Sequence, residues 1–193
     1  MSVANTAIKV CSRASVLMGG SLISSFSDGT IESDVCDAMY EDVARSCLTN
    51  TRWRFATNQE TLSQLALAPT GRFDSAYQLP SGMLMLNALT VDDLPIEYDI
   101  YGDKAYCNAV AQDEVIADYI FRADESNWLP YFVIAVEFSM AAILAVSVAR
   151  DAQLASLFEQ KASIYMMQAR RLDSQQQTTR KLNTSRFINQ RRS

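Results

Sequence analysis

Apolar residues recur every three to four positions in the first fifty residues of the chain, which is the spacing of amphipathic helices. The pattern predicts one helix over about 3–18, ended by Gly19 and Gly20. It predicts a second helix over about 31–50, with Thr30 as its N-cap. The side chains of this second helix that we expect to face the core are Ile31, Val35, Met39, Val43 and Cys47.

The pattern changes between about 52 and 122, where short runs such as "WRFATN", "MLMLNALTV" and "VIADYIFR" are separated by Pro, Gly and Asp. Several of these runs alternate apolar and polar residues, as half-buried strands do. The stretch "YGDKAY" has the Gly-Asp pair of a tight hairpin, and "LPSGML" predicts a turn that leads into a strand. We therefore expect one small antiparallel sheet inserted between helices.

Two further helices are predicted over about 130–149 and 151–172. Pro130 suits the first turn of a helix, and the segment that follows it is apolar nearly all round, as in a buried helix. The short connection at Arg150 and Asp151 favours an antiparallel helical hairpin, unless both segments run on as one long helix. The residues expected to pack between helices or between subunits are Ala135, Ser139, Ala142, Leu154, Phe158 and Tyr165.

Together these elements predict an α+β fold that is mainly helical. We expect a four-helix bundle with an inserted small antiparallel β-sheet and an extended C-terminal tail. A chain of 193 residues that is 49% hydrophobic can bury one sizeable core, so we expect a single body over 1–173. The remaining stretch, 174–193, is polar and lacks periodicity, and we expect a flexible tail there.

Charge is distributed unevenly along the chain, whose formal net charge is −5. The tail 174–193 has five basic residues and no acidic one, so the body holds 12 basic against 22 acidic residues, a net charge of −10. An acidic body repels nucleic acid, whereas a basic tail attracts phosphates or an acidic protein surface. Apolar side chains interleaved with the tail charges favour docking to a protein. The residues predicted to dock are Arg180, Lys181, Leu182, Arg186, Phe187, Ile188, Arg191 and Arg192.

The composition gives no support for catalysis, metal binding or a cofactor, and we expect the protein not to be an enzyme. The chain has no histidine, and its four cysteines form no Cys-x-x-Cys pair, which excludes the usual zinc patterns. The adjacent acids Asp92–Asp93 and Asp124–Glu125 are better explained as solvated turns than as a catalytic pair. Neither a calcium loop nor a glycine-rich phosphate loop is present. The cysteines are expected to be reduced, buried thiols in a cytoplasmic setting: Cys11, Cys36, Cys47 and Cys107.

The apolar segment after Pro130 is also about long enough to cross a bilayer. Glu137 within it, and the lack of a basic cluster next to either end, argue against membrane insertion. The N-terminal stretch lacks the basic and apolar regions of a signal peptide. A buried helix without membrane contact is therefore the favoured interpretation.

The order of these elements resembles a known family of viral proteins. The stretches that carry the resemblance are "LMGGSLISSFSDGTIESDVCDAMYEDVARSCLTNTRWRFATNQETL", "YQLPSGMLMLNAL", "IEYDIYGDKAYC" and "LPYFVIAVEFSMAAILAVSVARDAQLASLFEQKASIYMMQARRLDSQQQ". The chain is similar over about 3–177 to the tail tubular protein A family, the head-to-tail adaptors of short-tailed bacteriophages.

The resemblance implies a structural protein of the virion, located at the head-tail junction and assembled in the host cytoplasm. Such adaptors form a ring, typically dodecameric, beneath the portal protein, and the tail nozzle protein, of tail tubular protein B type, attaches below. DNA passes through the ring during ejection without sequence-specific binding. The family's C-terminal segment docks between portal subunits, a role that the resemblance assigns to 174–193.

Two other functions remain open at this stage. The basic tail could bind phosphates and make the chain a nucleic-acid-binding protein. The apolar helix could associate with a membrane. Salt-dependent DNA binding would favour the first, and solubility only in detergent would favour the second.

Overall fold

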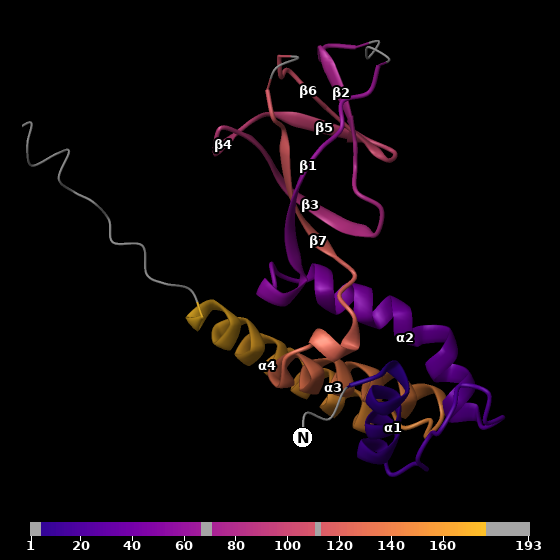
Figure 1. The fold of residues 1–193 in the computed structure, drawn as a ribbon. Coiled ribbons are helices and arrows are strands. Elements are labelled where there is room, and N and C mark those ends of the chain that lie inside the picture. The colour runs from indigo at the N-terminus through magenta and orange to yellow at the C-terminus, as the bar shows by residue number, and fades with distance from the viewer. Residues whose placement is uncertain (1–4, 67–70, 111–112, 177–193) are drawn as a thin grey trace, which may run out of the picture.

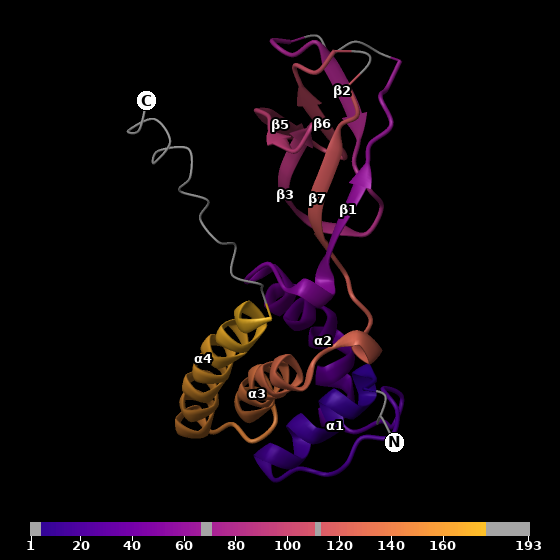
Figure 2. The same ribbon diagram turned by 60° about the vertical axis from the view of Figure 1, so that its left-hand side comes forward.

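The computed structural model describes residues 5–66, 71–110 and 113–176, and within them the fold is α+β (Figure 1). Four α-helices form a helical body, and a set of short strands projects from it as a second part. Strands β1 and β7 lead from one part to the other (Figures 1 and 2). The α+β class, the excess of helix over strand and the placement of the strands between the second and third helices are as predicted.

Capping residues explain where the first helix begins and ends and where the second helix begins. Helix α1 (Ala7–Met18) starts after Thr6, whose hydroxyl accepts a hydrogen bond from the backbone of Lys9, so it begins later than predicted. It ends at Gly19, which has a left-handed φ of 88°. Helix α2 (Ile31–Thr49) begins with a capping box between Thr30 and Ser33.

Helices α3 (Pro130–Ser147) and α4 (Ala152–Gln175) are separate, which decides between the hairpin and the single rod. The chain reverses at Arg150, which has a left-handed φ of 53°, and the Asp151 carboxylate caps α4. Helix α4 continues to Gln175, so the first residues assigned to the tail are helical.

The predicted four-helix bundle is not what the structure shows. Helix α3 lies at the centre of the body, with α4 on one side and α1 on the other, and α2 also packs on it (Figure 2). Contact between α1 and α2 is slight, and a groove separates α2 from α4. Helix α3 is apolar all round, and α1, α2 and α4 cover it from several sides. In a four-helix bundle, each helix instead packs one apolar stripe against its neighbours.

The strands form two small antiparallel sheets, not the single sheet expected. One sheet has the order β1-β7-β3-β4 and the other the order β2-β6-β5. The first consists of β1 (Thr57–Thr61), β7 (Ile116–Phe121), β3 (Met83–Val91) and β4 (Leu94–Pro95). The second consists of β2 (Ser75–Gln78), β6 (Lys104–Cys107) and β5 (Tyr98–Tyr101).

Tight turns explain where several strands end. The "YGDKAY" hairpin joins β5 to β6, with Gly102 at φ 65°. Asp92 and Asp93 also have positive φ, 48° and 63°, and form the turn between β3 and β4. These two acids are therefore turn residues, as predicted. The predicted strand at "WRFATN" was wrong in its first half, because Arg54–Ala56 form a 3-10 turn before β1 starts.

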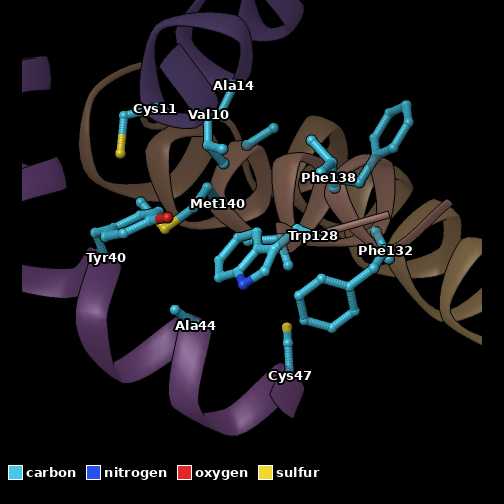
Figure 3. Close-up of a cluster of buried hydrophobic side chains, with 14 of the residues drawn as sticks. Val10, Cys11, Ala14, Tyr40, Ala44, Cys47, Trp128, Phe132, Phe138 and Met140 are labelled. Atoms are coloured by element: carbon cyan, nitrogen blue, oxygen red, sulfur yellow. The ribbon is translucent and has the colours of Figure 1, made fainter. Parts of the chain in front are cut away.

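Each part of the molecule has its own hydrophobic core. In the helical body, side chains from α1, α2 and α3 point toward one another around Trp128 and Met140 (Figure 3). Phe132 makes edge-to-face contacts with Trp53 and Trp128, each with ring centroids 5.0 Å apart. The second core lies between the two sheets and includes Leu89, which is fully buried.

Helix α3 is apolar except for one charged residue, Glu137. By length and composition, Pro130–Ser147 could cross a membrane, and 56% of that span is buried inside the protein. The Glu137 carboxylate accepts a hydrogen bond from Arg13 of α1 at 2.9 Å. Burial raises the pKa of Glu137, and the Arg13 guanidinium partly offsets that rise. The acid is thus paired within the helical body.

Candidate interaction groove on the helical body

The residues predicted to pack between helices or subunits lie on α3 and α4. Ala135, Ala142 and Phe158 are buried. Ser139 donates a hydrogen bond to the Ala135 carbonyl at 2.9 Å. Tyr165 of α4 is only partly buried, and its ring stacks on Phe138 of α3 at 4.8 Å. Leu154 is partly buried against the same core. Within one chain these six residues therefore pack helices.

Two of these residues also form part of a groove that no element of the described chain covers. We call it the helical groove; it runs between α2 and α4 and has α3 as its floor. It consists of two adjoining cavities of about 500 Å³ and 490 Å³, which share Ser139, Ile143 and Ala162. The floor is formed by small α3 side chains such as Ser139 and Ala142, which leave space between α2 and α4. Larger side chains line the groove around this floor: Asp42, Val43, Val146, Glu159, Met166 and Met167.

The orientation of α2 determines which of its side chains line the groove. Its predicted inward stripe points into the core only in part. Cys47 is buried, and Val35 and Val43 are partly buried against the helical core. Ile31 and Met39 are exposed. The other buried apolar side chains of α2 are Cys36, Tyr40, Ala44 and Leu48. The helix takes this orientation because the large ring of Tyr40 packs between Phe26 and Trp128. Ile31 and Met39 are thereby left exposed, and Val43 lies at the groove.

Two apolar side chains that line the groove are also largely exposed. Val146 at the end of α3 and Met167 on α4 are each 58% exposed. Scattered exposed apolar residues are ordinary on a protein surface, but exposed apolar side chains that line a groove are typical of a binding surface. The arrangement is therefore suited to an apolar segment of another chain or of the same chain.

The charged residues at the groove are mostly acidic. Asp42 on α2 and Glu159 on α4 line it, and neither forms an ion pair with another described residue. Arg170 lies at one end and donates to the Asn50 carbonyl at 3.4 Å. Burial raises the pKa of the Cys47 thiol to about 11, although a hydrogen bond with Ser139 lowers it, so this thiol is protonated at neutral pH.

A second, polar depression of about 720 Å³ lies where the helical body meets the strands. Arg52, Arg54 and Arg170 line it together with Asp118 and Asp173. Arg52 forms an ion pair with Asp118, and Asp173 accepts hydrogen bonds from the Arg54 backbone and the Tyr131 hydroxyl. Carboxylates thus offset most of the positive charge at this depression.

The polar and cysteine side chains of the described residues form no metal-binding cluster. No cluster of three or more His, Cys, Asp or Glu residues that could hold a metal ion occurs in 5–66, 71–110 and 113–176. In the same ranges every buried side-chain nitrogen or oxygen has a hydrogen-bond partner. All four cysteines are free and buried, as expected.

The predicted docking residues of the tail, from Arg180 to Arg192, lie outside the described residues. Sequence reasoning identified Ser139 and Ala142 but missed the groove walls Val43, Val146 and Met167. The sequence does contain a signal for one wall residue: Val43 belongs to an apolar stripe of α2, most of whose other positions are polar or small. Only the packing of Tyr40 shows that Ile31 and Met39 of this stripe are left exposed.

Two comparisons with known proteins found no relative of the chain. A scan against models of protein families found no match. A search of curated proteins found no match either. The resemblance to the tail tubular protein A family therefore stays a prediction from the sequence.

Proposed function

We propose that the chain is a noncatalytic connector of a phage virion, of the tail tubular protein A type. Copies of the chain form a ring, typically dodecameric, beneath the portal protein and above the tail nozzle protein. The ring continues the channel through which DNA leaves the head. The protein binds no cofactor and does not insert into a membrane.

The observation that best supports this proposal is the division of the molecule into two parts with separate cores. A connector needs one surface for the portal and another for the nozzle. The strands project from the helical body and are joined to it mainly by β1 and β7, so each part presents its own surface (Figure 1). The uncovered helical groove adds a further apolar surface for assembly.

Charge gives a second line of support. The net charge of −10 in the first 173 residues, repeated around a ring, would surround a channel with negative potential. Negative potential reduces adhesion of DNA that moves through the channel. The basic tail 174–193 can meanwhile bind an acidic portal surface, with Leu182, Phe187 and Ile188 as apolar anchors.

Electron microscopy of the full chain mixed with its portal tests this function. We expect rings seated on portal rings and no rings in the protein alone. Deletion of 177–193, which leaves α4 complete, should abolish binding. The variant Phe187→Ala with Ile188→Ala should weaken binding even in 1 M salt, where the Debye length is about 3 Å and purely ionic contacts are screened. Portal binding that survives the deletion would contradict the docking role of the tail.

The competing function, nucleic-acid binding, is tested on the same samples. Fluorescence anisotropy with a labelled DNA duplex should show no binding by the full chain at physiological salt. Binding that falls steeply with salt and disappears with the deletion of 177–193 would favour a nucleic-acid-binding protein instead.

A further inference from the structure

The helical groove is a partly apolar surface that the described residues leave uncovered. Its floor consists of small α3 side chains, and its walls include Val43, Met166 and Met167. Val146 of α3, which lines the adjoining cavity and is 58% exposed, adds to the apolar area. Methionine walls adapt to the shape of a bound apolar side chain because the thioether chain is flexible. The groove therefore fits a segment with a few separated apolar anchors.

Charge restricts the choice of occupant. Asp42 and Glu159 line the groove without an ion-pair partner among the described residues. Of the five acidic residues of α2, Asp42 lines the groove, and Arg170 of α4 is the basic residue at one end of it. A complementary occupant is apolar and basic, without acids. The stretch 177–193 has this composition: five basic residues, no acidic residue, and the apolar Leu182, Phe187 and Ile188.

The place where the described chain ends brings this stretch within reach. Gln176 caps the C-terminus of α4, the helix that forms one bank of the groove. Gln176 and Glu159, at the far end of the groove, are about 26 Å apart along the helix at 1.5 Å per residue. The segment 177–188 spans up to about 40 Å when extended. A return along α4 therefore lets Leu182 reach Met167 and lets Ile188 reach the level of Glu159.

We propose that, in the free protein, the helical groove holds the chain's own C-terminal segment 177–193, with Leu182, Phe187 and Ile188 in the groove and the basic side chains beside Asp42 and Glu159. The occupied groove covers the apolar surface of the single copy. It also keeps the anchors from other partners until a competing surface draws the segment out. This goes beyond the connector proposal and does not depend on a portal.

Disulfide trapping in the full chain tests the inference. One variant has Ser163→Cys in the groove wall and Ser185→Cys in the segment. The matched control has Gln168→Cys with Ser185→Cys; Gln168 is exposed on α4, outside the groove, and is closer in sequence to the segment. Mild oxidation of dilute protein should form the intramolecular Ser163 cross-link at least about five-fold faster than the control, because seating raises the effective thiol concentration. Unmodified protein gives the background of its four buried thiols.

A second pair of substitutions separates groove binding from simple proximity. In the Ser163→Cys and Ser185→Cys background, Met167→Asp should slow cross-linking at least about three-fold, since it puts a charge on an apolar wall. The control Leu172→Asp changes another exposed apolar residue of α4 that does not line the groove, and should leave the rate unchanged. Equal rates at Ser163 and Gln168, or equal effects of the two Asp variants, would overturn the proposal. Cross-links that form only between chains would overturn it as well and assign the groove to a second copy.

Discussion

At the scale of single residues, Arg122 links the two parts of the molecule. It follows β7, and its guanidinium donates hydrogen bonds to Glu41 of α2 at 3.0 Å and to Glu125 at 2.6 Å. Tyr40 donates to the same Glu125 carboxylate at 2.9 Å. Burial raises the pKa of Glu125. Hydrogen bonds from Arg122, its own backbone and Tyr40 lower the pKa by more than burial raises it, so the net pKa is below the usual value. The pKa of Glu41 is lowered in the same way by Arg122 and Arg45, against a rise from burial.

Replacement of Arg122 by methionine should destabilise the protein in a pH-dependent way. A carboxylate whose pKa is lower in the folded state contributes stability above its unfolded pKa of about 4.3, and that stability is lost as pH falls through the folded pKa. We expect Arg122→Met to reduce the free energy of unfolding by about 2–3 kcal/mol at pH 7, since it leaves Glu125 without its cation. The difference should shrink below pH 4. Urea unfolding at pH 7 and pH 3.5 measures both values.

Arg45 provides the matched control for this prediction. It pairs with the same Glu41, but both side chains of that pair are about half exposed. Arg45→Met should therefore cost less than about 0.5 kcal/mol at either pH. An Arg122→Met effect of the same size at pH 7 and pH 3.5 would show that lost packing on Trp128, not charge, explains the change.

At the scale of elements, the break between α3 and α4 depends on Asp151. Its carboxylate accepts hydrogen bonds from the backbones of Gln153 and Leu154 at 2.9 and 3.0 Å. We expect Asp151→Ala to lower the free energy of unfolding by about 1 kcal/mol, because two N–H groups of the first turn lose their partner. Asp151→Asn should keep most of the stability, since an amide oxygen also caps. Thermal unfolding of both variants tests this, and equal losses would contradict capping as the cause.

Helix ends were the elements that the sequence predicted best. Thr30, Pro130 and the Gly19–Gly20 pair act locally, through backbone geometry or a hydrogen bond within one turn, so their effect is visible in a short stretch. The sheet count was wrong because pairing is set by partners far apart in sequence, such as β1 with β7. The groove was missed for the same kind of reason: the periodicity of α2 marks an apolar stripe, but not which neighbour covers it.

At the scale of the whole molecule, the two hydrophobic cores are largely separate. The residue clusters share no buried member, and Phe121 of β7 is a partly buried residue packed against both. Among the described residues, the main contacts between helices and strands are those of α2 with β3 and β7. Each part should therefore open with a free energy of its own, because opening one part breaks only the apolar contacts of that part's core.

Core truncation combined with hydrogen exchange measures this separation. Leu89 and Leu144 are both fully buried, Leu89 in the core between the sheets and Leu144 in the helical core. Leu89→Ala should lower the opening free energy of amides in β3 and β7 by about 2–4 kcal/mol, the usual cost of a buried leucine. Amides of α3 should change by less than about 0.5 kcal/mol, since their contacts lie in the other core. Leu144→Ala should give the reverse order, with the larger loss in α3. Equal losses throughout the molecule for both variants would show one cooperative unit, and a connector with two independently stable parts would then be excluded.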